Sequence, residues 1–354
     1  MLANQSYPVA PGKHTVQKLP DIKMTSSQSV KLNVRIERWP IAGAFTISRG
    51  AKTQAVTVVA EVSRGGHTGR GECVPYPRYG ETPEATLATL KPMRELVRRG
   101  LDRQALQAAM PAGAARNALD CALLDLEAKT RGQRAWALLG RPAPRACTTA
   151  YTISLGSPEA MAAATAKAAH RPLLKIKLGG DGDGERIAAV RKAAPESELI
   201  VDANEAWTPD NLQRNLAACA LFGVTLVEQP LPAGKDEALA QIRRPLAVCA
   251  DESVHDRASL QGLRERYDAV NIKLDKTGGL TEAVAMAEAA QALGFEIMIG
   301  CMVATSLAMA PAMLLTQQAR FVDLDGPLLL AHDRDNGLRY DGSLVYPPDA
   351  TLWG

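Results

Sequence analysis

The sequence has 354 residues, of which 46% are apolar and 22% charged, with 41 lysines and arginines against 38 aspartates and glutamates. A chain of this length and composition can form two globular domains, and it is neither fibrous nor disordered as a whole. The net charge of +3 argues against nucleic acid or an anionic membrane surface as a partner. The aromatic content of only 4% argues against a channel that stacks nucleic-acid bases.

Three features bear on where the protein works. Residues 1–31 contain no apolar run, so we expect a poorly ordered extension rather than a secretory signal. The six cysteines are scattered without a CxxC pair, which favours reduced thiols and a cytoplasmic protein over a disulfide framework. Residues 297–319 carry no charge and approach the length of a membrane span. Their glycine, proline and hydroxyl residues instead favour a short strand followed by a buried helix.

The first domain is expected at residues 32–145 and has an α+β pattern. The runs 34–41, 44–50 and 55–62 resemble antiparallel strands, and Gly65-Gly66 provides a turn after them. Residues 83–139 then read as several helices. Within 115–129, for example, one helical face is lined by Leu119, Ala122, Leu123 and Leu126.

The second domain, at 146–330, alternates between short β-rich runs and stretches with helical spacing. The helical stretches include 208–222, 256–266 and 280–293. Thr208-Pro209 is a helix-start signal for the first of these and Asp256 for the second. Eight strands separated by helices predict a (β/α)8-type barrel. Residues 331–354 are too short to fold alone and are expected to return to the first domain. The eight runs are 146–154, 173–178, 198–202, 224–228, 246–251, 269–274, 295–300 and 320–325.

Acidic residues end three successive strands of this predicted barrel. Asp202, Glu228 and Asp251 are 26 and 23 residues apart, which is one strand–helix unit each. The active site of such a barrel lies at the C-terminal strand ends, so the three carboxylates can converge. Converging carboxylates fit a hard cation, and Mg²⁺, one per site, is the natural candidate. The alternative is that the aspartates only cap the helices that follow them.

Lysines flank the acidic residues. Lys175 and Lys177 share one face of the second strand, and Lys273 lies on the sixth strand, nearly opposite. We expect mutual repulsion and a nearby cation to lower a lysine pKa from about 10.4 toward about 7–8, as a general base requires. Two such lysines could remove a proton from one face of a substrate and return it to the other. The alternative is that Lys175 and Lys177 are solvated at a strand end.

The sequence around these residues resembles the enolase superfamily in KIK at 175–177, VDAN at 201–204, VEQP at 227–230 and ADES at 250–253. NIKLDKTGG at 271–279 resembles the muconate-lactonizing-enzyme subgroup. The resemblance implies a capped barrel, and the lack of histidine at 300–302 argues against a site of the mandelate-racemase type. It also implies that Asp202, Glu228 and Asp251 hold Mg²⁺. The implied acid/base pair is Lys177 and Lys273, and the implied enolate-stabilising lysine is Lys175.

The eighth strand carries the substrate signal. Asp323 and Asp325 alternate with Leu324, so both should face the pocket unless they are only strand-end caps. In dipeptide epimerases of the subgroup, such a pair binds the α-ammonium of the first residue. Residues 45–52 and 75–81 also resemble mobile loops of the Ala-Glu epimerases. The resemblance implies further substrate contacts at Arg49, which would meet a glutamate side chain, and at Tyr79, Thr152 and Cys301.

The resemblance therefore implies an isomerase that inverts the Cα of the C-terminal residue in L-Ala-D/L-Glu, in cytoplasmic recycling of murein peptides. The partner is a small-molecule dipeptide, and a homo-oligomer is expected. Alternatives are another dipeptide, o-succinylbenzoate synthesis or N-acylamino acid racemisation, all on the same fold. A barrel that binds dipeptides without catalysis is a further alternative.

Overall fold

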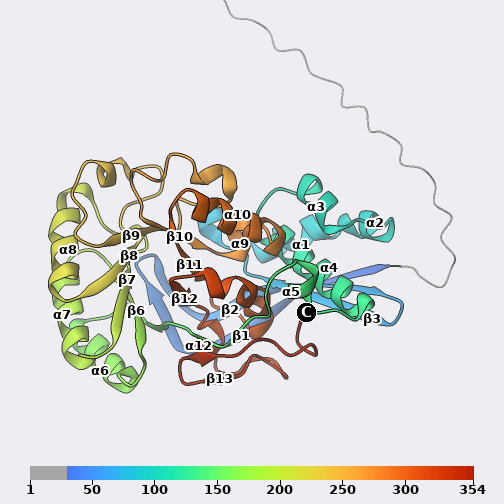
Figure 1. Ribbon diagram of the computed structural model, residues 1–354. Coiled ribbons are helices and arrows are strands. Elements are labelled where there is room, and N and C mark those ends of the chain that lie inside the picture. The colour runs from blue at the N-terminus through green and yellow to red at the C-terminus, as the bar shows by residue number, and fades with distance from the viewer. Residues whose placement is uncertain (1–29) are drawn as a thin grey trace, which may run out of the picture.

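A barrel and a smaller α+β cap lie side by side in the computed structural model, which describes residues 30–354 (Figure 1). The extension predicted at 1–31 lies almost entirely outside the described residues. Both parts of the predicted fold class, the near-closed eight-stranded barrel and the cap with antiparallel strands, are confirmed.

Three antiparallel strands form the sheet of the cap: β1 (Lys31–Ile47), β2 (Gly50–Arg64) and β3 (His67–Cys73). The two runs expected at 34–41 and 44–50 join into the single strand β1, whose register against β2 shifts between Pro40 and Phe45. This irregularity bends β1, and the β1–β2 turn at residues 48–49 reaches the open end of the barrel, where its side chains contact barrel loops.

The helix α4 (Ala114–Arg131) covers the cap sheet and is its main packing partner. Glycine at position 71 allows this approach, because a Cβ there would lie 2.1 Å from the carbonyl oxygen of Ala118. The four residues expected on one helical face, Leu119, Ala122, Leu123 and Leu126, are buried against the sheet. The helices of the cap are α1 (Pro83–Leu90), α2 (Met93–Arg98), α3 (Arg103–Ala109), α4 (Ala114–Arg131) and α5 (Ala135–Leu138), with the 3-10 helix η1 (Pro77–Tyr79).

Eight parallel strands form the barrel in sequential order. A backbone hydrogen bond of 2.8 Å from Ala150 N to the Val322 oxygen links the first strand region to the last and nearly closes it. The strands are β5 (Tyr151–Ile153), β6 (Leu173–Lys177), β7 (Glu198–Asp202), β8 (Val224–Glu228), β9 (Ala247–Ala250), β10 (Ala269–Ile272), β11 (Glu296–Gly300) and β12 (Phe321–Asp323).

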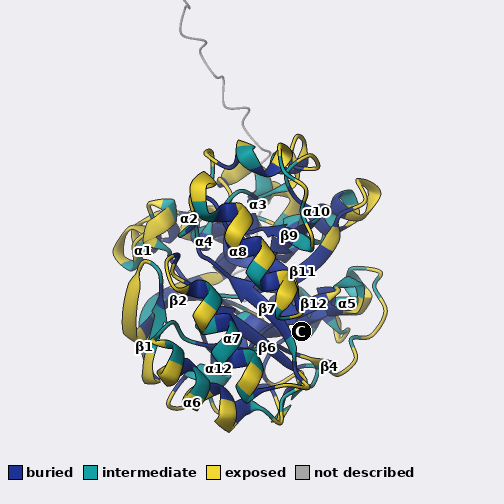
Figure 2. Cartoon of the chain, turned by 90° about the vertical axis from the view of Figure 1, so that its left-hand side faces the viewer, coloured by how far each residue is buried: buried dark blue, intermediate teal, exposed yellow. Residues whose placement is uncertain are grey.

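Helices surround the barrel and turn their exposed faces outward, while the strands inside are buried (Figure 2). The helix expected at 256–266 is wrong: only the 3-10 helix η3 (Arg257–Leu260) forms there, because Gln261 directly after it is extended and Gly262 then turns the chain with a left-handed φ of 85°. The other elements are α6 (Pro158–Ala168), α7 (Asp183–Ala193), α8 (Pro209–Leu221), η2 (Glu237–Ala240), α9 (Leu274–Thr277), α10 (Leu280–Ala292), α11 (Ser306–Ala312), η4 (Met313–Gln318) and α12 (Gly326–Leu329).

The uncharged segment 297–319 folds as predicted, into a strand (β11) followed by the buried helix α11 and the turn η4. None of the helices within residues 30–354 combines the length and the hydropathy that crossing a membrane requires.

The C-terminal segment returns to the cap. Strand β14 (Leu344–Val345) pairs with β13 (Tyr340–Asp341) and with β4 (Cys147–Thr148), so the run expected at 146–154 divides between this small sheet and the barrel strand β5. Further on, the fully buried Trp353 donates from Nε1 to the Cys121 oxygen of α4 at 3.2 Å. The tail thereby packs against the helix that covers the cap sheet.

An apolar layer closes the base of the barrel. It contains one buried residue from each strand or the residue just before it, and side chains two positions farther along each strand point to the same interior. The layer above this base is therefore the first that can form a site. The basal residues are Ala150, Leu173, Ile200, Leu226, Cys249, Ala269, Met298 and Phe321.

Candidate active site

The layer above the apolar base is almost entirely polar. Adding two positions to each basal residue gives Thr152, Lys175, Asp202, Glu228, Asp251, Asn271, Gly300 and Asp323, and the polar members are all buried. Adding two more places Lys177, Lys273 and Asp325 one layer higher, nearer the cap. The strand period of two therefore gathers the predicted site residues from several units at one end of the barrel.

The three predicted metal ligands lie at adjacent strand ends, and Asp202 is in register with Glu228. Each carboxylate faces an ammonium group: Asp202 Oδ2 lies 2.6 Å from Lys177 Nζ, and Asp251 Oδ2 lies 2.6 Å from Lys273 Nζ. Burial alone would raise the pKa of Asp202, but the adjacent lysines outweigh it and hold that pKa below its usual range. Lys273 and Lys276 likewise outweigh burial and lower the pKa of Asp251, so both aspartates are held as anions.

Glu228 differs from its two neighbours, because burial and the nearby Asp202 charge raise its pKa. Its Oε1 accepts a hydrogen bond of 2.7 Å from Asn271 Nδ2, and its Oε2 lies 2.6 Å from Lys175 Nζ. The Gly300 backbone leaves room for this amide, since a Cβ there would lie 2.5 Å from Asn271 Oδ1. Asn271 is thus a site residue that the sequence reasoning missed.

The donor set has the chemistry of a site for a hard cation: three buried carboxylates from neighbouring strands. As the side chains stand, they point at lysines, and no group of three or more His, Cys, Asp or Glu side chains within residues 30–354 is arranged around one ion position. Glu228 Oε2 is buried and meets the Lys175 ammonium as an ion pair at 2.6 Å, without the geometry of a hydrogen bond. An oxygen of that kind is suited to a metal ligand, so the residues present fit Mg²⁺.

The site lysines are buried, and carboxylates surround Lys175 and Lys273. Burial alone would lower the pKa of Lys175, yet the carboxylates of Asp323, Glu228 and Asp202 outweigh it and hold that pKa well above its usual value. Asp251 and Glu228 act in the same direction on Lys273. The expected lowering depends on a nearby cation and stays a prediction for the metal-bound site; in the structure carboxylates are the nearest charged neighbours of these two lysines.

Asp323 and Asp325 both line the cavity, as the alternation around Leu324 predicts. Asp323 Oδ2 lies 2.8 Å from Lys175 Nζ, and its Oδ1 is buried with no hydrogen-bond partner. Asp325 Oδ2 accepts a hydrogen bond of 2.7 Å from the backbone N of Thr152. Burial and the neighbouring Asp323 raise the pKa of Asp325 to about 7. The pair therefore has unsatisfied acceptor capacity for a cationic group.

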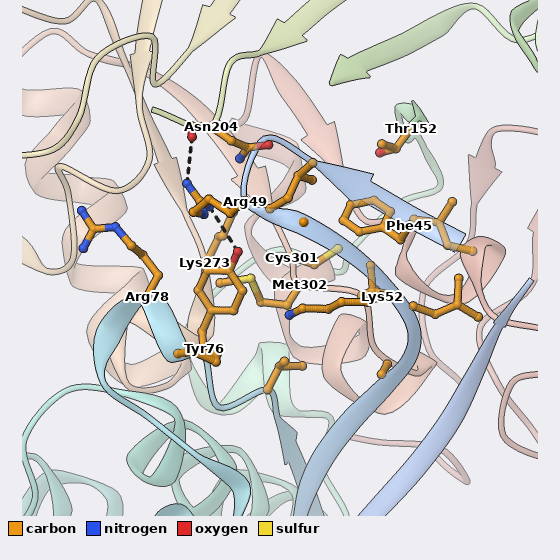
Figure 3. A pocket seen from close by; sticks show the side chains of 18 of the residues that line it. Phe45, Arg49, Lys52, Tyr76, Arg78, Thr152, Asn204, Lys273, Cys301 and Met302 are labelled. Atoms are coloured by element: carbon orange, nitrogen blue, oxygen red, sulfur yellow. Dashed lines mark hydrogen bonds between the residues drawn. The ribbon is translucent and has the colours of Figure 1, made fainter. Parts of the chain in front are cut away.

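A cavity of about 630 Å³ lies between the strand ends and the cap. The cap contributes the tip of the β1–β2 hairpin and the loop around η1 (Figure 3). Predicted residues on its wall are Lys175, Lys177, Lys273, Asp251, Asp323, Asp325, Arg49, Tyr79, Thr152 and Cys301. Asp202 and Glu228, which share a layer with Lys175 and Asp251, do not line the cavity and are nearly inaccessible.

Arg49 lines the cavity, but its guanidinium already has protein partners. Nη1 donates to the Asn204 oxygen at 2.9 Å, and Nη2 donates to Tyr76 Oη at 3.1 Å and to Glu252 Oε1 at 2.7 Å. Glu252 is buried beside the predicted ligand Asp251, and burial raises the pKa of Glu252 to about 7. Arg49 thus fastens the hairpin tip to two barrel loops.

Lys52 is a cavity residue that the sequence reasoning missed. It reaches from β2 into the pocket, with Nζ 4.8 Å from the centre of the Tyr76 ring (Figure 3). Among residues 30–354 it forms no ion pair with a carboxylate, unlike Arg49. Lys52 belongs to the segment 45–52, whose sequence already predicts a loop near the substrate. As a cation in that segment, it could have been named as a candidate beside Arg49.

The chain matches two described protein families, one after the other. Residues 29–140 match the "Mandelate racemase / muconate lactonizing enzyme, N-terminal domain", and residues 159–351 match "Enolase C-terminal domain-like". Two curated relatives are similar over most of their length. The L-Ala-D/L-Glu epimerase of Escherichia coli (strain K12) is 47% identical, covering 86% of this chain and 95% of that protein. The N-acetyl-D-glutamate racemase of Pseudoalteromonas sp. is 45% identical, covering 81% and 91%.

Solved structures agree with these matches. An enolase family member from Agrobacterium tumefaciens, described as homologous to dipeptide epimerases and solved with sodium and L-Ala-L-Glu, is 57% identical with a TM-score of 0.90, covering 92% of this chain and all of that one. The dipeptide epimerase of Enterococcus faecalis V583, solved with Mg and L-Leu-L-Tyr, is 28% identical with a TM-score of 0.84, covering 91% and 98%.

Proposed function

Since this chain is an isomerase that belongs to the enolase superfamily, in its mandelate racemase/muconate lactonizing enzyme family, we propose that it is a Mg²⁺-dependent dipeptide epimerase. The reaction is inversion at the Cα of the C-terminal residue, and L-Ala-D/L-Glu is the proposed substrate. The observation that carries the proposal is the pair Lys177 and Lys273, which line one cavity from the second and sixth of eight strands.

The two lysines act as a proton donor and a proton acceptor on opposite faces of the substrate. One lysine, neutral at the start, takes the Cα proton, and its ammonium partner delivers a proton to the other face, so the configuration inverts. Each lysine hydrogen-bonds a different carboxylate at 2.6 Å, Lys177 to Asp202 and Lys273 to Asp251. These bonds fix the two nitrogen atoms on separate sides of the site.

Asp202, Glu228 and Asp251 would hold the Mg²⁺. When bound, the ion supplies positive charge beside the substrate carboxylate, over which the charge left by Cα deprotonation is delocalised. Lys175 is fully buried among carboxylates, and its lasting positive charge stabilises the same developing anion from the protein side.

The opposite end of the dipeptide would be bound by the eighth strand. The free α-ammonium of the first residue can donate to Asp323 and Asp325, whose acceptor capacity is incompletely used within the protein. Tyr79, Thr152 and Cys301 complete the wall that encloses the dipeptide.

For the glutamate side chain we propose Lys52 as the main cation, in addition to the predicted Arg49. Arg49 is already bonded to Glu252 and Tyr76, whereas the Lys52 ammonium faces the cavity without a carboxylate partner among the described residues. A substrate carboxylate would therefore pair with Lys52 at little cost to existing contacts.

The proposed setting is recycling of murein peptides in the cytoplasm. The six free thiols are compatible with a reducing compartment.

Hydrogen exchange tests the proposal. In D₂O with Mg²⁺, the Cα–H of the second residue of L-Ala-L-Glu should exchange and the L,D epimer should accumulate, as followed by NMR. Lys273→Ala and Lys177→Ala should each abolish epimerisation. Absence of exchange with every dipeptide of a broad panel would refute the epimerase, and unchanged epimerisation in Lys273→Ala would refute the two-lysine mechanism.

Racemisation of N-acetylglutamate is the second candidate, favoured by the 45% identity to an N-acetyl-D-glutamate racemase. That substrate has no α-ammonium, so Asp323→Asn with Asp325→Asn should abolish dipeptide turnover and leave racemisation nearly intact. The reverse sensitivity would contradict the assignment of these two aspartates.

A further inference from the structure

Lys276 is a fourth lysine at the site, placed behind it rather than in it. It lies in the short helix α9, is only 2% exposed, and does not line the cavity, in contrast to Lys175, Lys177 and Lys273. It cannot touch a substrate, so any effect it has on the reaction must pass through another residue.

The ammonium of Lys276 is held by three oxygen atoms. Nζ donates to Oδ1 of Asp251, to the backbone oxygen of Asp251 at 2.6 Å and to the backbone oxygen of Asn271 at 2.9 Å. Oδ2 of the same Asp251 carboxylate lies 2.6 Å from Lys273 Nζ. One carboxylate is thus shared between a lysine that faces the cavity and a lysine that does not.

Asn271 extends this arrangement to the neighbouring strand. Its side chain donates to Glu228 Oε1 at 2.7 Å, while its backbone oxygen accepts from Lys276. The segment 271–276 therefore contacts two of the three carboxylates from behind and also presents Lys273 to the substrate.

We propose that Lys276 is a positioning residue that fixes the Asp251 carboxylate and, through its positive charge, keeps the affinity for Mg²⁺ lower than the carboxylates alone would give. The inference rests on the proposed function, in which Asp251 is a metal ligand. A buried ammonium bonded to a ligand repels a divalent cation and neutralises part of the charge that attracts it. The hydrogen bonds from Lys276 meanwhile hold the Asp251 carboxylate in one orientation. In that orientation its other oxygen can position Lys273.

When Lys276 is replaced, the loss of its charge should raise the affinity for Mg²⁺, whereas the loss of its hydrogen bonds should lower kcat. Lys276→Met leaves a buried carboxylate with one cation fewer, so Mg²⁺ should bind about tenfold more tightly or better. The loss of orientation should lower kcat for dipeptide epimerisation by about tenfold or more. A residue with a merely structural role would weaken both metal binding and turnover.

The experiment is isothermal titration of the purified full chain with Mg²⁺, paired with steady-state kinetics. Arg116→Met is the matched control: Arg116 is also a buried cation, but it reaches this segment from α4 and donates to the carbonyl oxygens of Thr277 at 2.7 Å and Gly278 at 3.0 Å, not to a metal ligand. It should lose stability without gaining Mg²⁺ affinity. Lys276→Gln, which keeps a hydrogen-bond donor without the charge, provides the same titration should the Met variant fail to fold.

Tighter Mg²⁺ binding with slower turnover in either Lys276 variant supports the inference. Unchanged or weaker binding in the variants, beside measurable binding in the wild type, overturns it and leaves the proposed function intact. A wild-type chain that does not bind Mg²⁺ overturns the metal assignment of the proposed function and this inference with it.

Discussion

Asp275 lies where the cap meets the barrel, two residues after Lys273, and it offers a quantitative test of the interface. It is buried, and its Oδ1 accepts hydrogen bonds from Asn117 Nδ2 at 2.8 Å and from the backbone N of Val74 at 3.1 Å. Burial raises the pKa of Asp275 from 3.8 to about 7, because these two neutral donors do not compensate for the loss of water.

The pKa of Asp275 predicts a loss of stability at neutral pH. A carboxyl group with a raised pKa in the folded state contributes its full stability below pH 3.8, and this contribution is lost as the pH rises through about 7. The difference between the unfolded pKa of 3.8 and the folded pKa of about 7 corresponds to about 4 kcal/mol of unfolding free energy, since each pKa unit is worth about 1.4 kcal/mol. Asp275→Asn keeps the accepting oxygen and removes the titration.

Urea denaturation from pH 4 to pH 8 measures the effect. The free energies of unfolding of wild type and Asp275→Asn should nearly coincide at pH 4, and above pH 7 the variant should be more stable by up to about 4 kcal/mol. Asp349→Asn is the control, because the hydrogen bond from Thr351 lowers the pKa of this exposed carboxyl, which is therefore charged throughout the range. Parallel pH profiles for wild type and Asp275→Asn would refute the reasoning.

Three further predictions concern specificity, the metal and packing. Lys52→Met should raise the KM for L-Ala-L-Glu by about tenfold and leave that for L-Ala-L-Leu nearly unchanged, because it removes the cation proposed for the side-chain carboxylate; equal losses in steady-state assays would contradict this role. Chelation by EDTA should abolish epimerisation and added Mg²⁺ should restore it, so turnover that persists in EDTA would exclude the proposed metal dependence. Gly71→Ala should lower the free energy of unfolding in urea by about 1–3 kcal/mol, because its Cβ would lie 2.1 Å from the Ala118 oxygen. Gly156→Ala, with its nearest neighbour 3.6 Å away, should cost much less, and similar costs for both would refute the packing argument.

The sequence was informative wherever a periodic pattern decides the structure. Strand–helix alternation predicts the barrel, and the spacing of Asp202, Glu228 and Asp251 by one unit each predicts that they meet at adjacent strand ends, where Asp202 and Glu228 are in register. The same rule of two positions per step would have found Asn271, since it stands two residues after the basal Ala269. Asn271 was missed because the candidate residues were chosen by charge, and an amide side chain is neutral.

Other features depend on distances that no pattern encodes. The raised pKa of Lys175 follows from three carboxylates within 3.3 Å of one ammonium, and a sequence cannot show which partner a lysine reaches. Similarly, the helix expected at 256–266 has a valid start signal at Asp256, but Gly262 adopts a left-handed conformation and the chain turns there.

The return of the C-terminal segment to the cap has a consequence for the order of folding. Trp353 packs against α4, and β14 pairs with β4, so partners that touch in the native structure are separated by the whole barrel. During synthesis the cap sheet and α4 emerge first, yet the surface that Trp353 covers stays open until the barrel residues have been made. Such long-range closure slows folding and leaves apolar surface exposed for a time. The cap can therefore complete its packing only after the barrel residues have been synthesised, although the two are separate in architecture.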